Sequence, residues 1–254
     1  GARVVLIEKG AMGGDCLNTG CVPSKALLAA AHRAEAVRTA RTFGITATPA
    51  IDFPAVHRHV HRVIASIAPH DSVERFEGLG VTVIKAKATF VSRRVVEAAE
   101  QTIRARRFVI ATGSRPTAPP IPGLAQTPYL TNESIFGLTD LPRHLVVIGG
   151  GPIGCELAQA FRRLGSSVTV LEAMAILPKD DPQLTAVVRQ ELIRDGVILH
   201  EKANITSVSP SPGGVSVTLK SDGVVEGSHL LVATGRSPNV EGLGLERAGI
   251  AYTA

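Results

Sequence analysis

Short runs of apolar, mostly β-branched residues recur along the chain, and polar or glycine positions end them. Such runs are typical of strands buried in a sheet, and the helical patterns between them indicate a mixed α/β fold. Three runs have a counterpart later in the chain, in the same order: residues 3–8 and 167–172, residues 81–90 and 197–205, and residues 108–116 and 231–238. The pattern therefore predicts two related units in tandem.

A proline-rich stretch marks the boundary between the two units. Five prolines lie between residues 116 and 128, where a helix cannot continue, so this stretch is interpreted as a connector. Leu141-Pro142-Arg143 then precedes a new strand. We therefore divide the chain into residues 1–139 and residues 140–254.

The second unit opens with a strand, a glycine loop, a helix and a second strand. A buried run at residues 145–148 leads into Gly149-Gly150-Gly151-Pro152-Ile153-Gly154, which is a G-x-G-x-x-G. A helical pattern follows and stops at Gly165, and the next strand ends at Glu172. This order, with an acid 23 residues after Gly149, is typical of a dinucleotide-binding βαβ unit.

Each glycine of this loop has a physical role in holding a pyrophosphate. Gly149 permits the tight turn, Gly151 lets the backbone approach the phosphates, and Gly154 lets the helix pack against the strand. The free N–H groups and the positive dipole end of the helix then face the phosphates. The candidate cofactor-binding residues of the loop are Gly149, Gly151, Ile153 and Gly154. The alternative is a glycine-rich turn that binds no ligand.

Glu172 bears on the choice of nicotinamide cofactor. A carboxylate accepts hydrogen bonds from both ribose hydroxyls of NAD and repels the 2′-phosphate of NADP. Ala173 and Met174 follow it, so no arginine stands there to pair with that phosphate. The sequence therefore favours NAD(H) over NADP(H).

Cys16 and Cys21 are the candidate redox residues. Their spacing would place the Cα atoms about 8 Å apart in an ideal helix, whereas a disulfide needs less than about 7 Å. Asn18 and Gly20 can supply an irregular turn that closes this gap, and a helical composition follows from Val22 onward. A thiol at the start of a helix ionises more readily, which favours thiolate chemistry.

Other interpretations of the cysteines stay open. A zinc site would need a second pair of ligands, and His32 alone does not supply it. Two unrelated buried thiols are the plain alternative, and the chain's three cysteines cannot form a disulfide scaffold. Cys155, on the packed side of its expected helix, is interpreted as a small core residue.

Composition and charge exclude several classes of protein. The chain has 254 residues, of which 44% are hydrophobic and 19% charged, so general disorder is excluded. No apolar run approaches the roughly 20 residues needed to cross a bilayer, and the start does not have the pattern of a secretory signal. The net charge of +5 comes mainly from dispersed arginines without a nucleic-acid-binding motif, and an anionic small ligand fits that charge.

Three histidines, His57, His59 and His61, alternate along one expected helix. His57 and His61 have the i,i+4 spacing with which two imidazoles can bind a metal ion on one helix face. A solvated helix face is the favoured interpretation, so we expect no metal site.

Taken together, the motifs resemble those of the class I pyridine nucleotide–disulfide oxidoreductases, which include dihydrolipoamide dehydrogenase, glutathione reductase and mercuric reductase. The resemblance covers nearly the whole chain and rests on motifs that fall in family order: Gly13 to Lys25, Ala111-Thr112-Gly113, the glycine loop, Glu172 and Ala233-Thr234-Gly235. It implies two Rossmann-like units with a three-layer ββα architecture, the first of them incomplete. The units would bind FAD in residues 1–139 and NAD(H) in residues 140–254.

The resemblance also implies roles for four candidate catalytic residues. Cys21 would face the flavin as a thiolate, and Cys16 would attack the substrate disulfide. Lys25 and Glu156 match a pair that lies near the flavin N5, between FAD and the nicotinamide. We therefore expect Lys25 and Glu156 to form an ion pair across the two units.

Further residues match positions that contact FAD. Glu8 would hold the adenosine ribose, and Gly14 and Asp15 would lie along the pyrophosphate. Ala88 matches the strand that meets the adenine, and Gly113 matches the turn beside the flavin cofactor. The two Ala-Thr-Gly motifs add Thr112 and Gly235 to the candidate cofactor-binding residues. Asp15 replaces the commoner threonine, and Pro152 replaces a tyrosine that some members use as a nicotinamide gate.

By the resemblance, the chain begins within its first unit and ends before a second FAD-binding stretch and an interface domain. In the family, that domain supplies an acid/base histidine from the partner subunit, so a homodimer is implied. The implied activity passes electrons from NADH through FAD to a Cys16–Cys21 disulfide and on to a small-molecule or protein-bound disulfide, such as a dihydrolipoyl-type group, in the cytoplasm. The alternatives are reduction of Hg(II) by a mercuric-reductase-like enzyme and a nucleotide-binding fragment without turnover.

Overall fold

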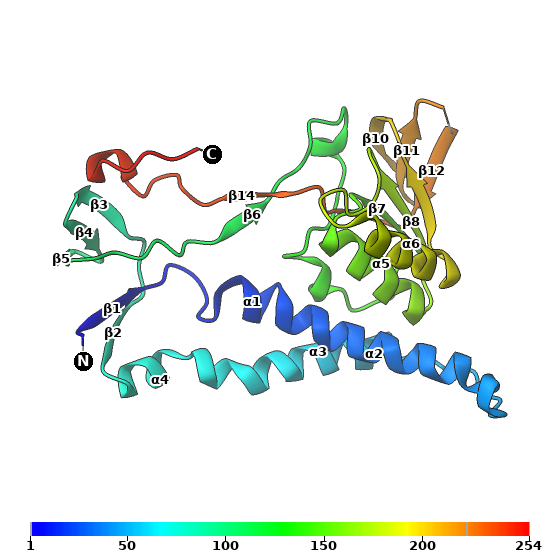
Figure 1. Ribbon diagram of the computed structural model, residues 1–254, viewed down its shortest axis with the longest axis horizontal. Coiled ribbons are helices and arrows are strands. Elements are labelled where there is room, and N and C mark those ends of the chain that lie inside the picture. The colour runs from blue at the N-terminus through cyan, green and yellow to red at the C-terminus, as the bar shows by residue number, and fades with distance from the viewer. Residues whose placement is uncertain (1, 222, 254) are drawn as a thin grey trace.

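The computed structural model describes residues 2–221 and 223–253 of the chain, so the outermost residues of the two expected units, 1 and 254, lie outside it. A four-stranded parallel sheet in the order β13-β7-β8-β9 organises the second half (Figure 1). Its strands are β7 (His144–Ile148), β8 (Ser167–Glu172), β9 (Ile198–Glu201) and β13 (His229–Val232). Successive residues of a strand point to opposite faces, so Val147 enters one core while Ile148 enters another.

Different layers cover the two faces of this sheet. Helices α5 (Pro152–Leu164) and α6 (Pro182–Arg194) pack on one face through Phe161 and Leu192. An antiparallel meander covers the other face, formed by β10 (Ile205–Ser211), β11 (Gly214–Leu219) and β12 (Gly223–Gly227). This arrangement confirms the three-layer ββα architecture predicted for the second unit.

The first half follows the same order of elements. Strand β1 (Val4–Ile7) pairs in parallel with β2 (Val81–Ile84), and an antiparallel meander follows. The meander consists of β3 (Thr89–Ser92), β4 (Val95–Ala98) and β5 (Gln101–Arg104). The helical elements between β1 and β2 are α1 (Gly14–Asn18), α2 (Cys21–Thr39), η1 (Ala40–Phe43), α3 (Phe53–Ile67), η2 (Ala68–Asp71) and α4 (Val73–Gly78).

The two halves differ at the strand expected over residues 108–116. Only β6 (Ser114–Pro116) forms there, and Val109 is 91% exposed. The matching run in the second half forms β13 because β7 pairs with it in parallel. A strand persists only where a neighbour satisfies its backbone N–H and C=O groups, and within the described ranges residues 108–113 pair with no such neighbour.

Helices α2 and α5 join the two halves. They run parallel, because Lys25 pairs with Glu156 near their starts and Arg38 donates a hydrogen bond to the carbonyl of Arg163 near their ends. Ala31 of α2 is fully buried in the core that these helices share, and small side chains let helix axes approach closely. In Figure 1, α2 begins near the middle of the molecule, beside α1, and extends beneath the second half.

A ribbon of two strands makes the second connection between the halves. Strand β6 pairs antiparallel with β14 (Arg236–Pro238). The connector, which in the structure extends from β6 to β7, carries η3 (Leu124–Gln126) and η4 (Ile135–Gly137), whose apolar residues enter the cores of the second unit. Beyond β14 the chain returns to the first half, where η5 (Leu245–Ala248) packs on β3. The division near residue 140 stays a prediction.

No helix of the described ranges is long and apolar enough to cross a membrane.

Truncation of Phe161 tests the shared core. Phe161 is 1% exposed and its ring lies 6.0 Å from that of Phe53. We expect Phe161→Ala to lower the free energy of unfolding by about 3–5 kcal/mol, because it removes buried contacts and leaves a cavity. Phe43→Ala is the matched control, since Phe43 is 84% exposed and its loss should change stability by less than about 0.5 kcal/mol. Urea unfolding followed by circular dichroism measures both, and equal effects would contradict the assignment of this core.

Candidate functional site

The glycine loop lies between β7 and the start of α5. Gly149 has φ +111°, and a Cβ there would stand 2.5 Å from the carbonyl oxygen of Ala233. A Cβ on Gly154 would stand 2.0 Å from the carbonyl oxygen of Gly149, so glycine is required for the helix to begin this close to the strand. Gly151 has no atom within 4 Å of its would-be Cβ, so there is open space beside the start of α5. Ile153 packs against the core behind the loop.

Glu172 places its carboxylate against this loop. One oxygen accepts a hydrogen bond from the Gly150 N–H at 2.6 Å, and the other accepts one from the Met174 N–H at 2.9 Å. An ionised carboxylate has about four acceptor sites, so two further hydroxyl groups can still be bound. Glu8 repeats part of this arrangement, because its carboxylate accepts a hydrogen bond from the Gly10 N–H at 2.6 Å. The internal repeat therefore extends to a side-chain hydrogen bond.

The candidate FAD contacts of the first half fall into two groups. Gly14 has φ +54° and open space around it, and the carboxylate of Asp15 lies 3.8 Å from the would-be Cβ of Gly113. Ala88 and Ile7, the neighbour of Glu8, pack in one small apolar cluster. Ala88 lies on no strand, which corrects the expectation from the resemblance, because pairing of β3 begins only at the next residue.

Thr112 and Gly235 lie at the ribbon between the halves. The Thr112 hydroxyl donates a hydrogen bond to the carbonyl of Asn239 at 2.7 Å, and the Gly235 carbonyl accepts one from the Thr117 N–H at 3.0 Å. Both positions therefore hold the two crossing strands together. Their roles as cofactor contacts stay predictions.

The two candidate redox cysteines lie on either side of an irregular turn. Cys16 belongs to α1 and Cys21 is the first residue of α2. A Cβ on Gly20 would stand 2.9 Å from the carbonyl oxygen of Asp15, and the Asn18 amide donates hydrogen bonds to the carbonyls of Met12 and Gly14. The turn expected from Asn18 and Gly20 is confirmed.

Cys16 and Cys21 are both free and exposed thiols in this structure. Hydrogen bonding to Cys21, with burial second, raises the pKa of the Cys16 thiol. The third cysteine, Cys155, is 6% exposed, and burial raises its pKa to about 11. The interpretation of Cys155 as a core residue is therefore confirmed, whereas Cys16 and Cys21 are exposed.

Lys25 and Glu156 form the ion pair expected across the two units, with 2.7 Å between Nζ and Oε1. The side chain of Lys25 is 64% exposed, so solvent screens the pair and its contribution to stability is small. A cation near a helix N-terminus is disfavoured, and Glu156 offsets that effect at the start of α2. The positive charge of Lys25 is therefore neutralised by Glu156 at the point where the N-termini of α2 and α5 meet.

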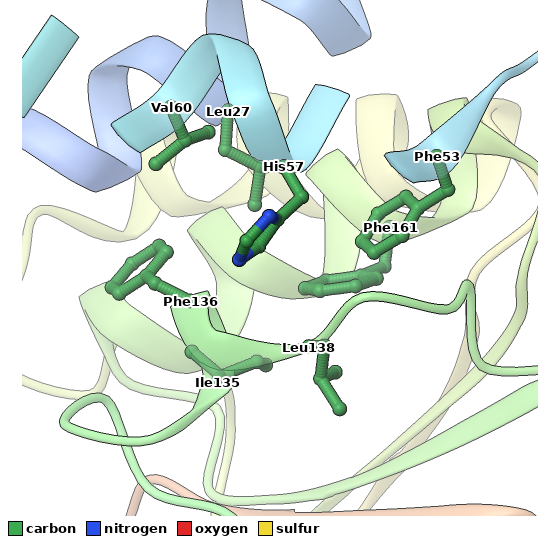
Figure 2. Close-up of a pocket in the computed structure, with 8 residues that line it drawn as sticks. All are labelled: Leu27, Phe53, His57, Val60, Ile135, Phe136, Leu138 and Phe161. Atoms are coloured by element: carbon green, nitrogen blue, oxygen red, sulfur yellow. The ribbon is translucent and has the colours of Figure 1, made fainter. Parts of the chain in front are cut away.

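The expectation that His57 lies on a solvated helix face is wrong, because its side chain is half-buried. Its ring lines a small apolar cavity together with Phe53, Phe136 and other residues (Figure 2). Burial lowers the pKa of His57, and its ring centroid lies 4.3 Å from that of His61. In the described part of the chain, no group of three or more His, Cys, Asp or Glu side chains could hold a metal ion.

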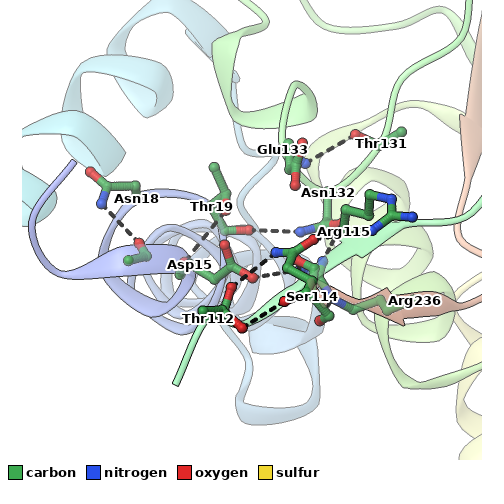
Figure 3. Close-up of polar contacts among 12 residues, drawn as sticks. Asp15, Asn18, Thr19, Thr112, Ser114, Arg115, Thr131, Asn132, Glu133 and Arg236 are labelled. Carbon is green, nitrogen blue, oxygen red and sulfur yellow. Dashed lines mark hydrogen bonds and ion pairs between the residues drawn. The ribbon is translucent and has the colours of Figure 1, made fainter. Parts of the chain in front are cut away.

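A hydrogen-bonded cluster around Arg236 was missed by the sequence analysis. The guanidinium reaches Asp15, Ser114 and Asn132, three residues that are far apart in the chain (Figure 3). The available signal was the matching pair of runs Gly113-Ser114-Arg115-Pro116 and Gly235-Arg236-Ser237-Pro238. Their pairing as β6 and β14 was not predictable from either run alone.

Comparison with known proteins supports the family resemblance. The model of the family described as pyridine nucleotide-disulphide oxidoreductase matches residues 1–254. A mercuric reductase from Streptomyces lividans is 39% identical over 260 residues, covering 98% of this chain and 55% of that protein. A dihydrolipoyl dehydrogenase from Geobacillus stearothermophilus is 36% identical over 263 residues, covering 100% of this chain and 55% of that protein. The chain thus spans about half the length of these relatives.

Solved structures agree with these relatives. LpdA from Mycobacterium tuberculosis superposes with a TM-score of 0.87 at 30% identity, covering 99% of this chain and 57% of that one. The HOCl-induced flavoprotein disulfide reductase RclA from Escherichia coli gives a TM-score of 0.84 at 30% identity, covering 99% and 55% of the two chains. The fold and the order of its elements are therefore those of flavoprotein disulfide reductases.

Substitution of Gly154 tests the close approach of α5 to the glycine loop. We expect Gly154→Ala to lower the free energy of unfolding by about 1–3 kcal/mol, because the new methyl group overlaps the carbonyl of Gly149. Gly78→Ala is the control, since that glycine ends α4 in open space and alanine there should be neutral or stabilising by at most about 1 kcal/mol. Urea unfolding by circular dichroism measures both. An unchanged midpoint in Gly154→Ala would show that the loop is not held as described.

Proposed function

The chain belongs to the pyridine nucleotide-disulphide oxidoreductase family, and on this premise we propose that it passes two electrons from NADH through FAD to a disulfide between Cys16 and Cys21. From there the electrons reach a small-molecule or protein-bound disulfide, such as a dihydrolipoyl-type group. One observation carries the proposal. The thiols of Cys16, in α1, and Cys21, at the start of α2, are both exposed, and Lys25 of α2 is paired with Glu156 of the other unit.

Members of the family use FAD and NAD(P)H. The second unit fits a dinucleotide, because Gly151 leaves the N-terminus of α5 open and Glu172 aims its carboxylate at the loop. In the first unit, Glu8 would bind a ribose, and Gly14, Asp15 and Gly113 would border the pyrophosphate. When bound, FAD supplies the two-electron step between a nicotinamide and a disulfide.

The thiols then carry out the exchange with the substrate. As a thiolate, Cys16 attacks one sulfur of the substrate disulfide, which forms a mixed disulfide and releases the other substrate sulfur as a thiol after protonation. Cys21 next attacks the sulfur of Cys16, releases the second substrate thiol and closes the Cys16–Cys21 disulfide. Since the pKa of Cys16 is raised, its first step needs a proton acceptor. The acid/base histidine of a partner subunit would fill this role, so we propose a homodimer.

A second candidate function is the reduction of Hg(II). It is favoured by the 39% identity to a mercuric reductase and by the exposure of both thiols, since soft thiolate ligands bind soft metal ions.

A third candidate is nucleotide binding without turnover, which bound flavin absorbance near 450 nm would argue against. Because each reductase activity depends on NADH, we place the protein in the cytoplasm. Oxidation of NADH driven by lipoamide but not by Hg(II) would select the disulfide reductase, and the reverse would select the metal reductase.

Substitution of each thiol in the full-length protein tests the redox assignment. Cys21→Ser should abolish disulfide reduction and also the long-wavelength absorbance of a thiolate beside oxidised flavin, because it removes that thiolate. Cys16→Ser should abolish turnover but keep this absorbance. Steady-state NADH oxidation and visible spectra measure both variants. Cys155→Ala is the control and should keep turnover and absorbance, whereas parental turnover in both serine variants would refute the assignment.

Glu172 should set the preference between the two nicotinamide cofactors. We expect NADH to bind at least tenfold more tightly than NADPH, which corresponds to about 1.4 kcal/mol, because a 2′-phosphate would face this carboxylate. Glu172→Arg should narrow or reverse the preference. Glu191→Arg makes the same change in charge on α6 and should leave the ratio of the two dissociation constants unchanged. Calorimetric titration measures the constants, and equal affinities in the unmodified protein would show that Glu172 does not face the ribose.

A further inference from the structure

Arg236 makes four polar contacts at the junction of the two halves (Figure 3). Its Nε donates to the Ser114 hydroxyl at 2.7 Å, and its Nη1 donates to the Asn132 side-chain oxygen at 2.9 Å. Its Nη2 donates to the carboxylate of Asp15 and to the carbonyl of Ser114, each at 2.5 Å. One guanidinium therefore joins β6, β14, the connector and the turn that carries the thiols.

Two of these contacts reach the residues around the thiols. Asp15 directly precedes Cys16, and Arg236 holds its carboxylate. Asn132 is oriented by Arg236 and donates its side-chain N–H to the carbonyl of Thr19 at 3.3 Å, two residues before Cys21. Arg236 thus holds the turn between the cysteines at its start, directly through Asp15, and at its end, through Asn132 and Thr19.

The turn between these two contacts is closed by backbone groups. The Thr19 N–H donates to the Asp15 carbonyl at 2.9 Å, and Gly20 lies so close to that carbonyl that a Cβ would be 2.9 Å from its oxygen. A shift of Asp15 therefore moves Gly20 and the start of α2 relative to Cys16. Since a disulfide needs Cα atoms within about 4.4–6.8 Å, the position of this turn decides whether the two sulfurs can join.

The chemistry of arginine suits this position. The planar guanidinium presents its donors in a fixed fork, so it can hold a carboxylate, an amide oxygen and a hydroxyl at once, whereas a lysine ammonium is a compact point charge. The side chain of Arg236 is 23% exposed and Asn132 is 9% exposed, so water competes less for the bond between them than for the bond to Asp15, whose side chain is 51% exposed. The carboxylate of Asp15, a residue that the resemblance places along the FAD pyrophosphate, is paired with the Arg236 cation.

We propose that Arg236 is a positioning residue that holds Cys16 and Cys21 at the spacing at which their disulfide closes. This inference rests on the proposed function, because it takes the Cys16–Cys21 disulfide as the redox group. Arg236 acts through Asp15 and Asn132 and touches neither sulfur. Loss of the clamp should leave the dithiol free to spread and should make the disulfide easier to reduce.

The test is the equilibrium of the full-length holoenzyme with glutathione. Reduced glutathione attacks the Cys16–Cys21 disulfide, so two glutathione molecules give one oxidised glutathione and the dithiol. Acid quenching, alkylation and peptide mass spectrometry then give the fraction of disulfide at each ratio of oxidised to reduced glutathione. We expect Arg236→Gln to lower the equilibrium constant for disulfide formation at least tenfold, which is about 30 mV for a two-electron couple.

Two further variants keep the test independent of the folding of Arg236→Gln. Asp15→Asn and Asn132→Ala each remove one arm of the clamp, and each should lower the same constant at least threefold. Arg115→Gln is the matched control, because Arg115 makes a bidentate pair with Glu241 on the same ribbon and does not reach the turn. It should change the constant by less than twofold.

The outcomes separate the two proposals. A wild-type protein that forms no Cys16–Cys21 disulfide at any ratio would overturn the proposed function and this inference with it. A wild-type disulfide whose constant is unchanged in Arg236→Gln, Asp15→Asn and Asn132→Ala would overturn only the positioning role. An equal fall in Arg115→Gln would also overturn it, since general weakening of the ribbon would then explain the effect.

Discussion

The parallel packing of α2 against α5 is the contact on which the other features of this protein depend. Each helix begins at a candidate functional group: α2 starts with Cys21, and α5 starts directly after Gly151 of the glycine loop. Parallel packing brings the two N-termini together, and their positive dipole ends favour thiolate and phosphate charge in one place. Alanines buried at 0% exposure, Ala31 and Ala158, permit this close packing. Without this packing, the thiols of the first half would not lie near the glycine loop of the second half.

The charge at this junction is balanced by pairs between distant parts of the chain. Lys25 reaches Glu156 across the helices, and Arg236 reaches Asp15 across the ribbon. Both pairs are partly exposed, so neither contributes much to stability. The two pairs instead fix positions, because each joins a residue near the thiols to an element of the second unit.

The ribbon of β6 and β14 complements the helix contact from another direction. It carries the chain out of the first half and back again, so both crossings between the halves run side by side. Residues after β14 then complete the small core around Phe90 through Leu245. The second unit is consequently joined to the first by the helix pair, by the ribbon and by this returning segment.

Local patterns determined the elements and much of the candidate site. The three repeated runs predicted tandem units, and the glycine spacing predicted the loop at Gly149, because close backbone approaches there admit no side chain. Residues 108–113 form no strand in the structure, because a strand depends on a neighbour to pair with and not on the apolar run itself. The partial burial of His57 and the contacts of Arg236 were also decided by tertiary structure, since each depends on segments more than 70 residues away in the chain. Sequence spacing along one helix or strand cannot report such contacts, because they arise only when separate elements pack together.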